Sequence, residues 1–539
     1  MLLLLACAPA DPPDTGTADD QATGTAHTGD TGEPAEFDDA DVQRAVEKDL
    51  DASYASAAQV AIWRDGQVVY SRAFGYRDPD SHEPVSISTL FQVGSDTKKM
   101  TAVALLQRVQ AGALSLDDSV ASAGIDIANA PGWSDACTLR QLLSHQGGLY
   151  DYTPWDDHPD DSYLGSHAAG EFSEREWAQS PPGATWNYSN PNFSLAGLAT
   201  ELAAGRPWAD IVEQDQFVPL GLSRTFARKE SVLADGDYAT GYGLLLGEYD
   251  GFEAWADIPY TLGRVSVDNT VDNAFTRPAG MVWSTAEQMA TYGGFLVDGN
   301  DSVLDAALLA ELSTPQVRLY PQIPEQQYGL GLMVLDGFQL GRKFYDTPLW
   351  VHGGNTMSFT SAFYVLPEQR VAIAILSNGY GDDFGSTVKA AIESLGVLPE
   401  ASDFPDWPTT PTDHALLAGS YVDPAIGEIV VTDLGSSLGV SIPGLVERGY
   451  DVGSTLSYGG VTDLYYVEID GYPWEFSFVA DSEGVYRYVR DRRFVGTRQD
   501  GVSGPPAASG QAHRRGRLSP AALDSVYARP PWPVVGWDR

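Results

Sequence analysis

Residues 91–100 read Phe-Gln-Val-Gly-Ser-Asp-Thr-Lys-Lys-Met, a pattern that predicts a sharp turn leading into a helix. Gly94 frees the backbone for the turn, and Ser95 is a residue type that favours a helix start. Residues 101–110 are rich in Ala, Leu and Val at helical spacing, so Ser95 and Lys98 would share one helix face. A serine hydroxyl needs a neighbouring base to become a nucleophile, and a buried lysine can be that base.

The Ser-x-x-Lys pattern is short, and it recurs at Ser386 and Lys389. A single match is ordinarily a capping serine beside a solvated lysine. What separates the first copy is order, because only Ser95 is followed by a Tyr-x-Asn and then by a His-Gly-Gly segment. Another His-x-Gly begins at His145, but it lies in a loop before the Tyr-x-Asn. Order therefore selects one set of three segments.

The two downstream segments carry residue types that suit an active site. Tyr188-Ser189-Asn190 is the only Tyr-x-Asn in the chain. A tyrosine is another possible base, and an asparagine amide can bind a lysine or a substrate amide. His352-Gly353-Gly354 follows a strand-like run, and glycines there let a substrate backbone approach an edge strand. Taken singly, the first segment would be a loop turn and the second a strand-end histidine.

Composition limits the possible partners. The chain has 539 residues, 74 acidic and 32 basic, and a net charge of −42. Such a charge repels nucleic acid and anionic lipid surfaces, so binding to either is not expected. The partner that the serine-centred segments predict is a small-molecule or peptide substrate. The oligomeric state stays open. The eight histidines show no metal-ligand spacing, so neither a metal nor another cofactor is expected.

The first seven residues, Met-Leu-Leu-Leu-Leu-Ala-Cys, resemble the lipobox of bacterial lipoproteins, in which the cysteine is lipidated. Cys7 is then the expected lipidation site, although no Lys or Arg precedes the apolar run. The alternative is an ordinary signal peptide, shortened at its start. Both interpretations predict export, and the first predicts a lipid anchor in the bacterial cell envelope as the one membrane attachment. No other stretch has the roughly 18 apolar residues of a membrane span.

The remaining chain divides by composition into five parts. Residues 8–36 are rich in Asp, Thr and Gly and predict a disordered tether, and residues 37–398 predict an α/β domain interrupted by a helical subdomain. Helices are expected at 174–179 and 192–204, on either side of Tyr188. A proline-rich linker at 399–411 precedes a domain of seven short alternating strands at 412–499, which is typical of a small β-barrel. Residues 500–539 predict a disordered tail.

The three segments in this order resemble the serine β-lactamase and penicillin-binding-protein family. The resemblance covers about residues 40–397. It is greatest to the class C β-lactamase-related branch, which includes D-alanyl-D-alanine carboxypeptidases, D-aminopeptidases and family VIII carboxylesterases. It implies an antiparallel sheet with flanking helices plus a helical subdomain, and the distal strands resemble the small C-terminal barrel of many such proteins.

The resemblance also implies a role for each site residue. Ser95 would attack the substrate carbonyl, and Lys98 would assist its deprotonation. Tyr188 would shuttle the proton, and Asn190 would orient Lys98 and the substrate. The backbone N–H groups of Ser95 and of the residue after the glycine pair would form the oxyanion hole. The residues so assigned are catalytic Ser95, Lys98, Tyr188, Asn190 and His352, and substrate-binding Ser95, Gly353, Gly354 and Asn355.

One departure bears on the substrate. Many members of the family have lysine where this chain has His352, and histidine is largely neutral at pH 7. We therefore expect poor β-lactam turnover, with an ester or a D-amino-acid peptide as the favoured substrate. Together with the N-terminal segment and the three motifs, this predicts an exported serine hydrolase that acts through an acyl-enzyme. The sequence does not favour esterase activity over peptidase activity, or the reverse. The alternative is an inactive binding lipoprotein of the same fold, and a purely structural surface lipoprotein is the third interpretation.

Overall fold

An antiparallel sheet forms the centre of the molecule. The computed structural model describes residues 39–175, 177–246 and 260–499, so the predictions for Cys7, the tether at 8–36 and the tail at 500–539 lie outside the described residues. Within these ranges nine strands pair in one sheet. Their order is β3 (Glu83–Pro84), β2 (Gln67–Asp78), β1 (Ala57–Arg64), β15 (Val371–Ser377), β14 (Thr360–Leu366), β13 (Leu349–Asn355), β10 (Met333–Leu335), β9 (Gln326–Tyr328), β8 (Val317–Arg318).

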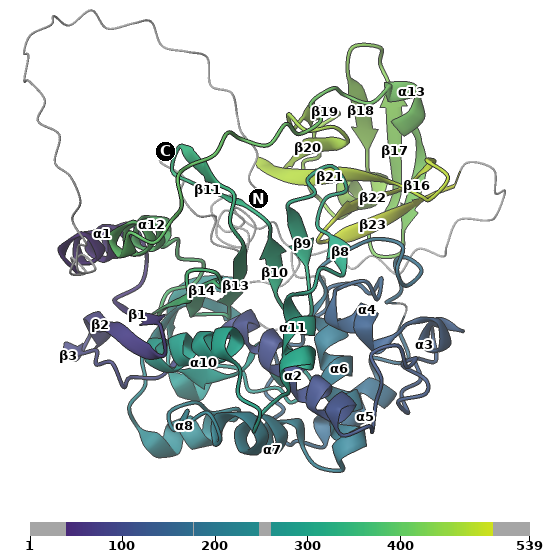
Figure 1. Ribbon diagram of the computed structural model, residues 1–539. Helices are drawn as coiled ribbons and strands as arrows, with labels where there is room; N and C mark the ends of the chain where they lie inside the picture. The colour runs from purple at the N-terminus through teal and green to yellow at the C-terminus, as the bar shows by residue number, and fades with distance from the viewer. Residues whose placement is uncertain (1–38, 176, 247–259, 500–539) are drawn as a thin grey trace, which may run out of the picture.

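The two ends of this α/β body meet in the middle of the sheet. Strand β1 pairs antiparallel with β15, and Val60 lies opposite Ile375. Alternate residues of β1 face two different cores: Ala61 packs in the core that contains α10 (Ala286–Asp298), and Val60 in the core that contains α1 (Asp39–Asp51) and α12 (Gly385–Leu395). Both faces of the sheet are thus covered (Figure 1), which explains why every residue of β14 and β15 is buried.

A helical region interrupts this body. It is built mainly around α2 (Thr97–Gln110) and α6 (Asn190–Ala204), which pack against each other (Figure 1). None of the described helices is long and apolar enough to cross a bilayer. The others are α3 (Trp133–Ala136), α4 (Leu139–Leu143), α5 (Tyr163–Ala169), α7 (Trp208–Val212), α8 (Lys229–Asp235), α9 (Arg277–Gly280), α11 (Ala306–Ser313), and the short turns η1 (Gly94–Asp96), η2 (Glu213–Phe217) and η4 (Val267–Asn269).

The prediction of a helix at 174–179 is wrong. Its backbone instead bonds to the loop before Tyr188: Tyr150 donates to the Trp177 carbonyl at 2.8 Å, and Gln179 donates to the Gly148 carbonyl at 2.8 Å. These tertiary bonds replace the local bonds of a helix. Short strand pairs complete the body: β4 (Phe91–Gln92) with β7 (Trp283–Ser284), β5 (Gly241–Leu246) with β6 (Tyr260–Val265), and β11 (Phe338–Leu340) with β12 (Lys343–Tyr345).

A closed barrel follows, and it also contains α13 (His414–Leu417) and α14 (Pro443–Glu447). Alternate residues of β21 point inward, among them Trp474, Phe476 and Phe478. Seven strands match the predicted pattern and β23 is an eighth. The strands are β16 (Gly419–Asp423), β17 (Gly427–Asp433), β18 (Leu438–Ser441), β19 (Thr455–Tyr458), β20 (Leu464–Ile469), β21 (Tyr472–Ala480), β22 (Tyr486–Asp491) and β23 (Phe494–Arg498).

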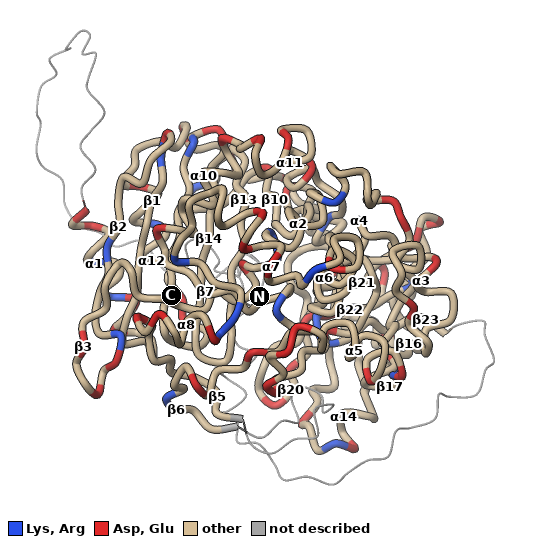
Figure 2. Tube along the Cα trace, turned by 90° about the horizontal axis from the view of Figure 1, so that it is seen from below, with Lys and Arg blue, Asp and Glu red and all other residues tan. Residues whose placement is uncertain are grey.

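The barrel is docked beside the β8 edge of the sheet (Figure 1). Tyr320, just after β8, donates to Glu475 of the barrel at 2.6 Å, and Arg490 donates to the Leu319 carbonyl. Gln179 donates to the buried carboxylate of Asp423 at 2.8 Å. These bonds join the two bodies on the side where the Tyr188 segment lies. Acidic residues occur around the outline of both bodies (Figure 2), so the negative charge is not confined to one segment.

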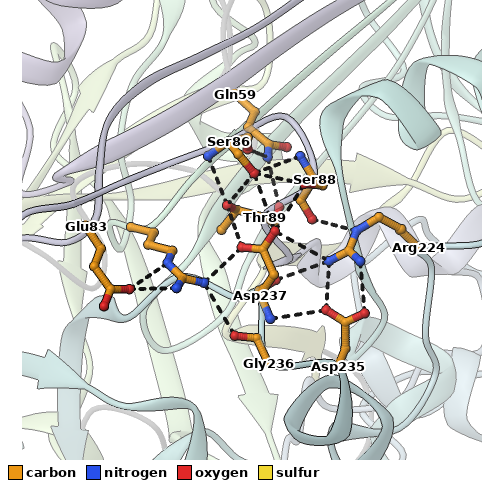
Figure 3. Close-up of polar contacts among 10 residues, drawn as sticks. Gln59, Glu83, Ser86, Ser88, Thr89, Arg224, Asp235, Gly236 and Asp237 are labelled. Carbon is orange, nitrogen blue, oxygen red and sulfur yellow. Dashed lines mark hydrogen bonds and ion pairs between the residues drawn. The ribbon is translucent and has the colours of Figure 1, made fainter.

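A polar network anchors the segment that precedes β4. The Asp237 carboxylate accepts from Thr89 Oγ1 at 2.9 Å and from Ser88 Oγ at 3.1 Å, and it pairs with Arg77 at 3.0 Å (Figure 3). Its backbone carbonyl accepts from Leu90 N–H at 2.9 Å. The network fixes the chain a few residues before Ser95, and so it contributes to the position of the turn that carries the serine.

Candidate active site

Ser95 lies in η1, the tight turn that precedes α2. Gly94 has φ +55°, a left-handed conformation that glycine adopts without strain. The Thr97 hydroxyl donates to the Gly94 carbonyl at 2.8 Å and closes the turn. Ser95 itself is only half-buried, whereas its neighbours Gly94 and Asp96 are buried. The predicted turn and helix therefore hold the serine at the start of α2 with its side chain partly accessible.

Two further groups predicted from the sequence converge on the Ser95 hydroxyl. Lys98 Nζ lies 3.0 Å from Ser95 Oγ, and Tyr188 OH donates to the same oxygen at 2.8 Å. Lys98 comes from the first turn of α2 and Tyr188 from the segment just before α6, so tertiary packing brings them together. Both side chains are almost fully buried. A nucleophile with two adjacent proton carriers is the arrangement that acyl transfer requires.

Burial shifts the pKa values of both members of this pair. It lowers the pKa of the Lys98 amine well below its usual value and raises the pKa of the Tyr188 phenol. A neutral amine has two N–H groups and one lone pair. The N–H groups match the Asn190 Oδ1 acceptor at 2.7 Å and the Ala279 carbonyl at 2.6 Å. In this neutral form the lone pair is left for the Ser95 hydroxyl and can accept its proton.

Asn190 holds Lys98 and is itself held by two residues that the sequence motifs do not include. Its Nδ2 donates to Thr153 Oγ1 at 2.9 Å, and its backbone N–H donates to Asp151 Oδ1 at 2.8 Å. Asp151 and Thr153 lie in the loop that the sequence shows only as acidic and irregular. Nothing local in that loop distinguishes these two residues, so sequence analysis misses them.

The glycine pair on β13 lies against the Ser95 turn. A methyl group on Gly354 would come within 2.0 Å of the Val93 carbonyl oxygen and 2.7 Å of Ser95 N. One on Gly94 would come within 2.7 Å of Asn355 N. The backbone nitrogens of Ser95 and Asn355 therefore lie in one crowded region where only glycine fits. That placement is compatible with the oxyanion pair that the resemblance implies.

A buried ion pair fixes the other side of α2. Lys99 Nζ donates to Asp96 Oδ1 at 2.6 Å, and both side chains are fully buried. The second Asp96 oxygen is 2.5 Å from Ser361 Oγ, and Ser361 lies opposite Gly354 in the sheet. The pair thus ties the serine turn to the strand next to β13. No motif marks Asp96 as special, because its partner strand is distant in sequence.

Comparison with known proteins identifies the family. A model of the family described as Beta-lactamase matches residues 42–395, more than half of the chain. This chain belongs to the beta-lactamase family. The protein flp of Staphylococcus aureus (strain COL) is 26% identical over 338 residues, which are 62% of this chain and 61% of that protein. The match thus covers about three fifths of that curated relative.

Solved structures share the fold. A penicillin-binding protein homologue from Pyrococcus abyssi, described as octameric, gives a TM-score of 0.54 at 19% identity, and the match covers 84% of this chain and 98% of that one. A D-stereospecific amidohydrolase from Streptomyces sp. gives a TM-score of 0.51 at 26% identity, covering 66% and 98%. The predicted fold class is confirmed: a β-lactamase/transpeptidase-like antiparallel sheet with helices, followed by a small barrel.

His352 is the member of the predicted set that offers no surface to a substrate. Its side chain is fully buried on β13, Nδ1 lies 2.8 Å from the Gly353 carbonyl oxygen, and Nε2 lies 3.2 Å from Tyr328 OH. Burial lowers the pKa of the imidazole well below its usual value. In this beta-lactamase-family chain the third motif therefore places a neutral ring behind the site, while Gly353 continues the strand to Gly354 and Asn355.

His145, the histidine of the other His-x-Gly segment, packs against Tyr188. Its ring centre is 4.2 Å from that of Tyr188, and Nδ1 accepts the Ser189 backbone N–H at 3.1 Å. Burial keeps its pKa low, so the ring is a neutral packing partner. Motif order excludes it from the third motif, and sequence analysis gives no indication that it supports Tyr188. Its left-handed backbone, φ +57°, is visible only in the structure.

The second Ser-x-x-Lys copy lies elsewhere, on α12. Ser386 Oγ accepts from Lys48 Nζ of α1 at 3.2 Å.

In the described residues, no group of three or more His, Cys, Asp or Glu side chains is arranged to hold a metal ion. Cys137 is buried, and burial raises the pKa of its thiol, so it is an inert part of the core.

Proposed function

We propose that this chain is a serine hydrolase that forms an acyl-enzyme on Ser95 and acts on D-amino-acid amides and short peptides, with activated esters as further acyl donors. One observation carries the proposal: Lys98 Nζ and Tyr188 OH both lie within hydrogen-bond distance of Ser95 Oγ, at 3.0 and 2.8 Å. Membership of the beta-lactamase family supports the reaction class. The likeness to a protein named as a D-stereospecific amidohydrolase supports the amide substrate.

The geometry supports a direct route for the proton. Neutral Lys98 accepts the Ser95 hydroxyl proton while Oγ attacks the substrate carbonyl carbon. The developing oxyanion is stabilised by the backbone N–H groups of Ser95 and Asn355, and each such donor is worth roughly 10²- to 10³-fold in kcat. Tyr188 OH also lies within hydrogen-bond distance of Ser95 Oγ, at 2.8 Å, so it can deliver a proton to the leaving nitrogen. A water molecule then attacks the acyl ester by the same path in reverse.

The third motif supports weak activity on β-lactams. His352 is buried and neutral, so it places no fixed positive charge where a β-lactam carboxylate would bind. We therefore propose that kcat/KM for a chromogenic cephalosporin such as nitrocefin is far below that for the best amide or ester. A value equal to that of the ester would contradict this part of the proposal.

The test compares wild type with two serine variants on one panel. The panel contains D-amino-acid anilides, D-Ala-D-Ala peptides, p-nitrophenyl acetate and butyrate, and nitrocefin. Ser95→Ala should lose activity by more than about 10⁴-fold, because it removes the nucleophile. Ser386→Ala, in the second Ser-x-x-Lys copy, is the matched control and should retain full activity. Mass spectrometry after fluorophosphonate treatment should place one label on Ser95. Folded wild-type protein that neither turns over the panel nor labels would favour a binding protein.

A further inference from the structure

One hairpin of the C-terminal barrel reaches the candidate active site. Arg492 lies in the turn between β22 and β23. Its guanidinium carbon is 4.4 Å from the centre of the Tyr188 ring. Its Nε donates to Asp151 Oδ2 at 2.7 Å, and Nη2 is 2.7 Å from the same oxygen. A residue of the barrel therefore contacts both the tyrosine on Ser95 and the carboxylate that holds Asn190.

These contacts continue without a break to the nucleophile. Asp151 uses its other oxygen to accept the Asn190 backbone N–H at 2.8 Å, and Asn190 Oδ1 accepts from Lys98 Nζ at 2.7 Å. The Asp151 side chain is only 7% exposed, whereas that of Arg492 is 35% exposed. Removing Arg492 would leave a nearly buried carboxylate without its cation, next to the residue that orients Lys98.

The positive charge of Arg492 also acts on the protonation of Lys98 and Tyr188. The groups that act on Lys98 or Tyr188 are Asp96, Asp151, His145, His352, Tyr328 and Arg492. Burial lowers the pKa of both histidines, and burial raises the pKa of Tyr328, so these three rings are neutral. The two carboxylates favour protonated Lys98, and the permanent positive charge of Arg492 favours the deprotonated forms of both Lys98 and Tyr188.

We infer that Arg492 is a positioning residue of the active site, supplied by the C-terminal barrel, which fixes Asn190 through Asp151 and holds a permanent positive charge against Tyr188. The inference rests on the proposed acyl-enzyme function at Ser95. It gives the barrel a part in catalysis, because the site is incomplete without the β22–β23 turn.

The experiment measures two rates across pH 5 to 10 on the full chain: fluorophosphonate labelling of Ser95, and kcat/KM on the best panel substrate. The variants are Arg492→Gln, Arg492→Lys and Arg487→Gln. Arg487 is the charge-matched control, because it lies on β22, is partly exposed like Arg492 and pairs with Asp481 of the barrel. Arg492→Gln should slow both reactions by about tenfold to a hundredfold at neutral pH. Its acid limb should shift to higher pH, because deprotonation of Lys98 and Tyr188 becomes harder without the cation.

The other variants separate positioning from folding. Arg492→Lys keeps the charge and lacks the planar fork, so its acid limb should stay near that of wild type while its rate falls severalfold. This variant carries the test if Arg492→Gln does not fold. Arg487→Gln should match wild type. A folded Arg492→Gln protein with an unshifted acid limb, or an equal loss at every pH in both Arg492 variants, would overturn the inference.

Failure of the proposed function gives a different result. If wild type labels at Ser95 but hydrolyses no panel member, the proposed function is wrong, and the labelling profiles still decide the role of Arg492. If wild type neither labels nor hydrolyses, both proposals fall together. If wild type hydrolyses a substrate and Arg492→Gln behaves as wild type at every pH, only the inference about the barrel falls.

Discussion

Two segments of this chain carry the same Ser-x-x-Lys pattern, and the structure gives them opposite surroundings. Lys98 is fully buried and bonds to Ser95, Asn190 and the Ala279 carbonyl. Ser386 is half-buried at the start of α12, where it accepts a bond from a lysine of α1. In both patterns the serine and the lysine are three residues apart, so the difference comes from burial and from distant partners. A buried amine within hydrogen-bond distance of a serine hydroxyl can act as its base, whereas Ser386 bonds to a lysine of another helix.

The largest expected effect separates the two lysines. Lys98→Ala should lower kcat/KM by about 10³- to 10⁴-fold on the best panel substrate, because it removes the proton acceptor 3.0 Å from Ser95 Oγ. Lys389→Ala, at the matching position of the second copy, should stay within about twofold of wild type. Steady-state kinetics on both purified variants measures the difference. A Lys98→Ala enzyme with near wild-type activity would make Tyr188 the working base.

Each copy of the pattern has a buried carboxylate beside it, Asp96 at the first copy and Asp49 at the second. The next comparison is between these two side chains. Asp96→Asn should lower the free energy of unfolding by about 3–5 kcal/mol, since it leaves the Lys99 charge fully buried without its partner. Activity should fall as well, because Asp96 ties the serine turn to Ser361. Chemical denaturation followed by tryptophan fluorescence measures the change. A loss below about 1 kcal/mol would mean that Lys99 is already neutral in the folded protein.

The sequence predicts those parts of the molecule that depend on local pattern. Strands such as 371–376 are continuous apolar runs because helices cover both faces of the sheet, and that pattern is visible without the structure. The order of three short motifs is enough to predict that Ser95, Lys98, Tyr188 and Asn190 lie in one site. The turn at Gly94 follows from the residue type alone.

Other parts depend on contacts that no local pattern contains. Asp151 and Thr153 become important because α6 begins at Asn190 and presents its N–H and amide to them. Arg492 belongs to a hairpin that reads as an ordinary part of the barrel, and only docking places it against Tyr188. The 174–179 segment has a helical pattern, but its amides bond to the 148–150 loop instead. In each case tertiary structure overrides the local signal.

The smallest expected effect concerns the carboxylate beside the second copy. Asp49 of α1 accepts from Thr387 N–H and Thr387 Oγ1, both at 2.8 Å, and so it caps α12 from another helix. Burial raises the pKa of this carboxyl above its usual value. Asp49→Asn keeps one acceptor oxygen and should cost about 0.5–1 kcal/mol in the free energy of unfolding, near the low end for a helix cap. Its kcat/KM should equal that of wild type, because the Asp49 carboxylate bonds to Thr387 and not to a residue of the candidate site. If Asp49→Asn were as damaging as Asp96→Asn, the two copies would not differ in the way that their surroundings indicate.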